Sequence, residues 1–93
     1  MSEASEREKA QAAMADAVRR IGEAHAAMAA TLARMVEGGE STADRDAGEL
    51  HALSNDLVEL TYMLADGRRA WRWAVRDEHT RAALAKAQGR GDG

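Results

Sequence analysis

The residues of this sequence that are best suited to binding chemistry gather in one short segment, residues 68–76. This segment contains four arginines and both tryptophans of the chain, and it contains no acidic residue. Guanidinium groups bind phosphates and carboxylates, and indole rings stack on bases or on guanidinium planes. Arginine stems and tryptophans can equally serve packing alone. We predict a partner-binding surface made of Arg68, Arg69, Arg72, Trp73 and Arg76.

The three histidines do not follow a metal-binding pattern. His25, His51 and His79 each have an acidic residue two positions earlier, but residues two apart on a helix do not share a face. Metal-binding helices instead carry a glutamate three residues before a histidine, or two histidines four residues apart. The chain also has no cysteine, which excludes disulfides and thiolate chemistry. We therefore predict no catalytic residue, no metal and no cofactor, and hence a protein that is not an enzyme.

The composition favours helix throughout the chain. The 93 residues contain no proline and are rich in alanine, leucine, methionine, glutamate and arginine, all of which favour helix. A chain of this length forms one domain. Alanine accounts for 22 residues and phenylalanine for none, so a lone monomer would have a thin core. We expect self-association or a partner to supplement that core.

Glycines and capping residues divide the chain into three predicted helices, at about residues 5–37, 42–66 and 68–88 of one domain spanning 1–88. Ser2 or Ser5 is expected to cap the first helix, and Gly38 to end it in a left-handed conformation. Gly67 is expected to break the second helix, with one uninterrupted helix as the alternative. Residues 89–93, which include three glycines, are predicted to form a flexible tail.

Large side chains recur along the first helix in alternating steps of four and three residues. The row is Met14, Val18, Ile21, His25, Met28, Leu32 and Met35. Such a seven-residue repeat indicates helix pairing, and we predict that its residues from Met14 to Leu32 mediate self-association. His25 is expected to be a core histidine that fixes the register, with a pH-sensitive element as the alternative. Small residues flank the row on both sides, which indicates contact with more than one neighbouring helix.

These observations predict an all-α fold. The expected architecture is an antiparallel helical hairpin with a third helix or helical extension, self-associating into a bundle as a homodimer or higher oligomer. By helical periodicity, Trp71 should be buried and Trp73 exposed, with Arg69 stacked on Trp73.

The charge is divided unevenly along the chain, which can mark an interaction surface or two elements that pair with each other. Residues 1–67 hold six basic and 13 acidic residues, whereas residues 68–93 hold seven basic and three acidic ones. We expect a small protein-binding module, an adaptor, inhibitor or regulator of the kind encoded by phages and mobile elements. Nucleic-acid or nucleotide binding through residues 68–76 is the alternative. The polar N-terminus is unlike a signal peptide and no apolar run could span a membrane, so we expect a cytoplasmic protein.

Overall fold

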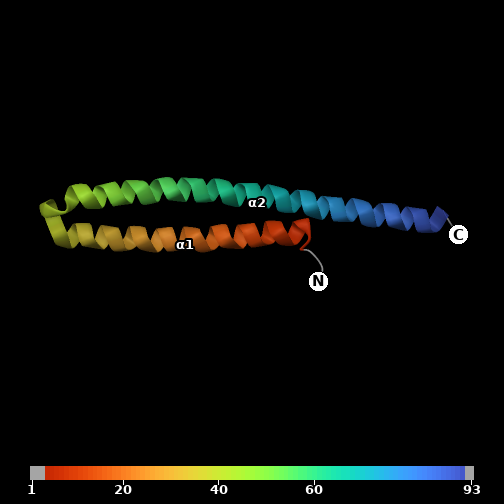
Figure 1. The fold of residues 1–93 in the computed structure, drawn as a ribbon, viewed down its shortest axis with the longest axis horizontal. Coiled ribbons are helices and arrows are strands. Elements are labelled where there is room, and N and C mark those ends of the chain that lie inside the picture. The colour runs from red at the N-terminus through yellow and green to blue at the C-terminus, as the bar shows by residue number, and fades with distance from the viewer. Residues whose placement is uncertain (1–3, 92–93) are drawn as a thin grey trace.

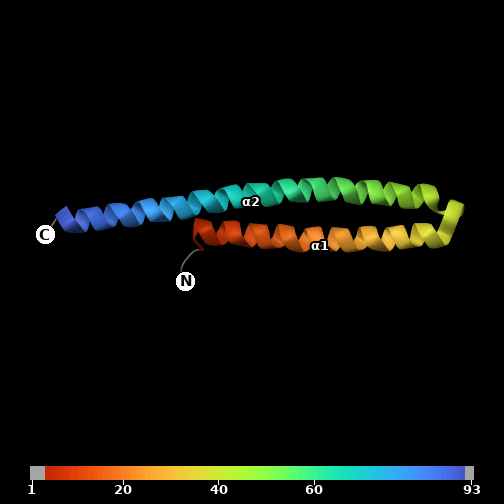
Figure 2. The ribbon, with the colours of Figure 1, turned by 180° about the vertical axis from the view of Figure 1, so that it is seen from behind.

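The computed structural model describes residues 4–91, which form two α-helices joined by a short turn. Helix α1 spans Glu6–Gly38, the 3-10 turn η1 spans Gly39–Ser41, and helix α2 spans Ala43–Gly91. The described residues include no strand, and the prediction of an all-α fold is therefore confirmed. The two helices lie side by side and run in opposite directions, with η1 at one end of the molecule (Figures 1 and 2).

The molecule is a rod rather than a globule. It measures 80 × 24 × 14 Å, and its radius of gyration is 22.0 Å, whereas a compact chain of this length would have about 12 Å. Helix α2 has 49 residues and α1 has 33. An ion pair of 3.6 Å between Arg7 and Glu78 lies near the N-terminal end of α1, and α2 continues past that end as a single helix (Figure 1).

The ends of α1 are capped by specific residues. Ser5 Oγ accepts a hydrogen bond from the Glu8 amide at 3.1 Å, as predicted; the alternative cap, Ser2, lies outside the described residues. The prediction for Gly38 is wrong by one position, because Gly39 has the positive φ of 59°. Gly38 stays helical and is required for space, since an added Cβ there would overlap Thr42 Oγ1.

The predicted break at Gly67 is wrong, and with it the separate third helix over residues 68–88. Helix α2 passes through Gly67 without interruption. This glycine is buried against α1, where an added Cβ would lie 2.8 Å from Met14 Cγ. It therefore allows two helices to approach closely rather than ending one. Helix α2 also includes residues 89–91 of the predicted flexible tail, while residues 92–93 lie outside the described part.

Small side chains form the contact between the helices. The most buried column of α1 is Ala10, Ala17, Ala24 and Thr31, each seven residues from the next, and it faces a column of α2 that includes Asp46, Leu60 and Gly67. Because alanines let a neighbouring backbone come close, α2 packs on the alanine side of the methionine row. The expectation that His25 lies in the core is wrong for the single chain, in which His25, Val18 and Leu32 are exposed.

Candidate functional site

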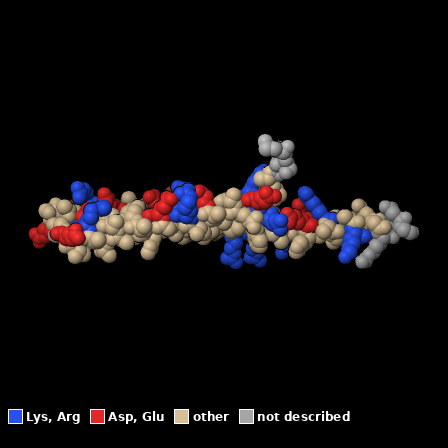
Figure 3. All heavy atoms as spheres, turned by 90° about the horizontal axis from the view of Figure 1, so that it is seen from below, with Lys and Arg blue, Asp and Glu red and all other residues tan. Residues whose placement is uncertain are grey.

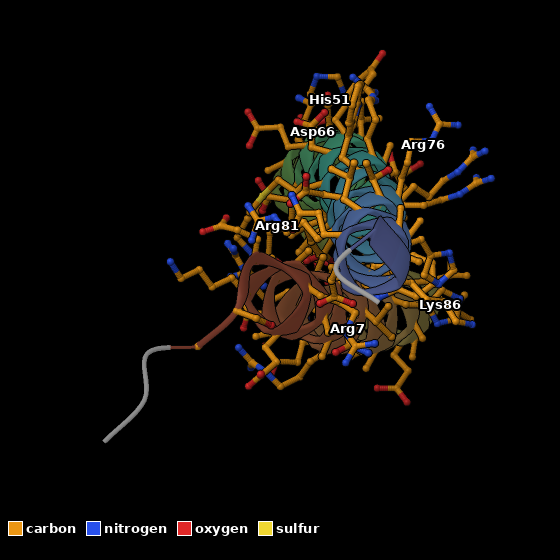
Figure 4. The ribbon with its side chains drawn as sticks, turned by 90° about the vertical axis from the view of Figure 1, so that its right-hand side faces the viewer. Arg7, His51, Asp66, Arg76, Arg81 and Lys86 are labelled. Atoms are coloured by element: carbon orange, nitrogen blue, oxygen red, sulfur yellow. The ribbon has the colours of Figure 1, made fainter. Side chains whose placement is uncertain are left out.

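The Arg/Trp segment, residues 68–76, lies where α2 reaches the N-terminal end of α1. All five predicted partner-binding residues in it are exposed, and Trp73 retains 66% of its surface accessible to solvent. Trp71 is half-buried, so the periodicity distinguished the two indoles in the right order. Arg76 projects from α2 on the side away from α1 (Figure 4).

One arginine of the segment already contacts the exposed indole. The guanidinium carbon of Arg76 lies 5.8 Å from the centroid of the Trp73 ring, within the range of a cation–π interaction. Arg69 was expected in that place but instead pairs with Asp66, with 3.6 Å between Nη2 and Oδ1. Arg68 and Arg72 form no ion pair with any described residue. Their charges are therefore available to an anionic group.

Two hollows in the surface of the segment are lined by arginine and tryptophan together. An open hollow of about 500 Å³ is lined by Trp71, Arg72, Val75, Arg76, His79, Thr80 and Ala83. A smaller one of about 220 Å³ is lined by Arg69, Arg72, Trp73 and Arg76. The Trp71 Nε1 atom is shielded from solvent and donates no hydrogen bond to any residue that the structure describes. Cationic groups beside aromatic rings can hold a carboxylate, a phosphate or a planar ring.

A second candidate surface runs along one side of the helix pair. A groove of about 320 Å³ between the helices is lined by His25, Met28, Ala29, Leu32, Leu50 and Leu57. In the half of the molecule nearest η1, charged side chains gather along one long edge and the opposite edge is mostly uncharged (Figure 3). Farther from η1, basic side chains project from that second edge. We call the surface around the groove formed by His25, Met28, Ala29, Leu32, Leu50 and Leu57 the apolar face.

Some of the charges elsewhere on the pair are neutralised locally. Arg19 binds Asp16 and Glu23, each at 2.6 Å, and these contacts raise the pKa of its guanidinium group, with the hydrogen bond to Asp16 contributing most. A groove on the polar side is lined by further charged residues, among them Arg20, Asp56 and Glu59. Ion pairs this exposed contribute little to stability but give one side of the rod a strongly polar character.

A buried polar cluster near η1 was not found from the sequence. Asp46 has no exposed surface, and neither carboxylate oxygen accepts a hydrogen bond within the described chain. Arg34 Nε lies 4.0 Å and Arg45 Nε 3.8 Å from Asp46 Oδ1, and Arg34 also binds Glu49. The available signal was spacing, because Asp46 stands seven residues before Leu53 in the row that faces α1.

Other kinds of site have no matching geometry in residues 4–91. No three His, Asp or Glu side chains of this region converge on a point that could hold a metal ion. Neither helix has a stretch apolar enough to cross a bilayer. Comparison of the chain with protein-family models, with curated proteins and with solved structures finds no match.

Proposed function

We propose that this chain is a small non-enzymatic protein-binding module, an adaptor, inhibitor or regulator that acts through its helical surfaces. The supporting observation is the uncovered apolar face beside an exposed Arg/Trp segment. Val18, Leu32 and Val36 keep 56%, 55% and 79% of their surfaces exposed, although large aliphatic side chains gain free energy by leaving water. Contiguous apolar surface of this kind marks interaction sites in soluble proteins.

The apolar face supports self-association into a helix bundle. Of the residues predicted for this role, Met14, Ile21 and Met28 are only half-buried by α2, and Val18, His25 and Leu32 are exposed. The row therefore faces partly toward α2 and partly toward the exposed apolar face. A neighbouring helix pair on that side would complete the burial of all six residues.

The Arg/Trp segment supports recognition of a further protein in the cytoplasm. An exposed tryptophan flanked by arginines has the composition of an interface hot spot. Trp73 and Arg76 already contact each other, which restricts both side chains and lowers the entropy that binding would cost. An acidic or aromatic-rich surface on the partner would complement this pair.

Capture with matched variants tests the proposal. Tagged wild-type chain, Trp73→Ala and Tyr62→Ala are each used to capture proteins from the native host. Tyr62 is the control because it is also an exposed aromatic, 70% accessible, but lies outside the Arg/Trp segment. We expect Trp73→Ala to lose the specific partner and Tyr62→Ala to retain it. Equal capture by all three chains would contradict the assignment.

Nucleic-acid binding is a second candidate, favoured by Arg68 and Arg72, which share a segment with Trp73 and pair with no acidic residue of the described part of the chain. Binding to single strands would weaken with salt, with a log–log slope of about −0.7 for each phosphate neutralised. Fluorescence anisotropy with a labelled single-stranded oligonucleotide at 50 and 200 mM salt measures this slope. Tight, steeply salt-dependent binding that Arg72→Ala weakens would favour this function over protein binding.

A further inference from the structure

The outer edge of α2 beside the apolar face carries opposite charges at its two ends. Asp44, His51, Val58, Ala65 and Arg72 stand seven residues apart, so they lie on one side of the helix, and all five are exposed. The acidic residue stands at the η1 end and the basic residue in the Arg/Trp segment. Val58 is the midpoint of this column, two heptads from each charge.

The same end-to-end polarity holds for the surrounding sequence. Residues 37–49, around η1, contain five acidic residues and one arginine, whereas residues 68–76 contain four arginines and no acidic residue. These two regions are about 40 Å apart along α2, at 1.5 Å per residue. Two copies in parallel would place like charges together at both ends, and two antiparallel copies would place opposite charges together.

The register between the helices places a matching centre on α1. Thr31 Oγ1 lies 3.3 Å from Glu49 Oε2, and Met14 lies against Gly67. Gly22 of α1 and Val58 of α2 are midway between these two contacts, so they lie level with each other. Gly22 is also the midpoint of a column of exposed residues on the apolar side of α1: Glu8, Ala15, Gly22, Ala29 and Val36. An added Cβ at Gly22 would meet nothing within 4 Å, so this level of the surface is open.

We propose that a second copy of this chain covers the apolar face in an antiparallel, two-fold arrangement whose axis passes level with Gly22 and Val58. In this dimer α1 packs along α1 of the second copy and α2 along α2, and Arg72 of each copy meets Asp44 of the other. The inference rests on the proposed function, since it names the occupant of the apolar face.

This arrangement divides the Arg/Trp segment between two roles. Arg68 and Arg72 lie on the side of α2 that adjoins the apolar face, and they face the acidic η1 end of the second copy. Arg69, Trp73 and Arg76 lie farther round the helix and stay outside the dimer. The dimer thus presents two Trp73–Arg76 pairs to other partners, and the apolar residues Val18, His25 and Leu32 become covered.

A charge exchange tests the orientation. Sedimentation measures the dimer dissociation constant of Asp44→Arg, Arg72→Asp and the double variant, with Asp56→Arg on the polar side as the control. Each single reversal at the interface creates two repulsive pairs per dimer, so we expect the constant to rise about tenfold. The double variant should return near the wild-type value, and the control should leave it unchanged. The proposed orientation would be overturned if the single variants had the same dissociation constant as the control. It would also be overturned if the double variant did not return to the wild-type constant.

Cross-linking tests the position of the axis, and the absence of native cysteine removes any background. A short bis-maleimide should join two Val58→Cys chains, because Val58 lies at the axis in the proposed dimer. His51→Cys chains should not join each other, because these residues would be about 20 Å apart, but they should join Ala65→Cys chains when the two are mixed. Efficient linking of His51→Cys to itself would overturn the antiparallel register.

The two proposals fail separately. A chain that sediments as a monomer at 100 µM overturns the dimer, yet Trp73-dependent partner capture could stand. A cross-linked antiparallel dimer whose captured partners are insensitive to Trp73→Ala supports the dimer and contradicts the assigned partner site.

Discussion

Gly67 of α2 lies directly against Met14 of α1, so closely that a β-carbon on the glycine would stand 2.8 Å from Met14 Cγ. The Met14 amide nitrogen and the Ala10 carbonyl oxygen would be 3.6 and 3.7 Å from the same position. A residue whose type usually interrupts a helix thus sets the distance between two helices. The contact joins segments more than fifty residues apart in the sequence.

Gly67→Ala is expected to destabilise the protein despite its better helix propensity. The gain is about 1 kcal/mol, whereas overpacking costs about 1–3 kcal/mol, so we expect a net loss of about 1 kcal/mol in the free energy of unfolding. Adding Met14→Ala should relieve part of this loss. Gly48→Ala is the control, because nothing lies within 4 Å of its added Cβ, and it should gain up to about 1 kcal/mol. Thermal melts measure all three variants; a stabilised Gly67→Ala would show that the helices can separate freely there.

Asp46→Leu is expected to raise the melting temperature at pH 7. The carboxylate has no exposed surface and accepts no hydrogen bond from the described residues, and replacing a weakly paired buried charge by an apolar side chain often stabilises a protein by about 1–4 kcal/mol. Its position in the first turns of α2 opposes this, but the helix dipole contributes only about 0.3–1 kcal/mol. A lower melting temperature would mean that Asp46 has a stabilising partner in solution.

Gly39→Ala is expected to destabilise the turn. Gly39 combines φ of 59° with ψ of −144°, a backbone region that other residues rarely occupy, at a cost of about 1–3 kcal/mol. Urea denaturation should show a lower midpoint with an unchanged m-value. Gly48→Ala, within regular helix, again serves as the control, and a Gly39→Ala chain as stable as this control would mean that the turn adopts another conformation.

Trp71→Ala and Trp73→Ala are expected to differ in stability. Truncating a fully buried large side chain costs about 3–5 kcal/mol. Trp71 is half-buried, so we expect a loss of about 2 kcal/mol. Trp73 is 66% exposed, and its removal should change stability by less than about 0.5 kcal/mol. Chemical denaturation followed by circular dichroism distinguishes these values, and equal losses would assign both indoles to packing.

His25→Leu is expected to strengthen self-association rather than to stabilise the monomer. His25 is exposed on the helix pair and lines the apolar groove beside Leu32. Burying a leucine in its place within the proposed dimer should lower the dissociation constant about tenfold. The melting temperature should then rise and depend more strongly on protein concentration. A lower melting temperature would show that His25 makes a hydrogen bond that leucine cannot replace.

Local sequence signals predicted the local structure well. Ser5 was one of the two serines predicted to cap α1, because its hydroxyl can satisfy a free amide, and that contact depends on neighbouring residues only. The exposure of Trp73 followed from the helical period alone. The side of α1 that contacts α2 could not be predicted in this way, because Ala17 and Val18 are both apolar and adjacent. Close approach of the two helices favours Ala17 at the contact with α2, whereas burial of large side chains favours Val18 there.

The structural roles of Gly67 and Asp46 also could not be predicted from the residues around them. Glycine lowers helix propensity wherever it stands, but whether a helix breaks depends on what lies beside it. Nothing in the residues around Gly67 shows that Met14 occupies that space. Asp46 reads as a surface residue by type, and only the position of α1 encloses it. The pairing of distant segments therefore decided both outcomes.

The end of α2 that extends past α1, residues 79–91, should report binding through its rate of amide hydrogen exchange. An isolated helix of about 12–15 residues is marginal in water because its first turn is costly to form, but residues 79–91 extend a helix that is already nucleated. Their amide protons should therefore exchange progressively faster toward Gly91, with opening free energies that fall toward zero. A molecule that binds and rigidifies the Arg/Trp segment would slow amide hydrogen exchange in residues 79–91 without contacting them. Binding could therefore be detected at residues outside the binding site.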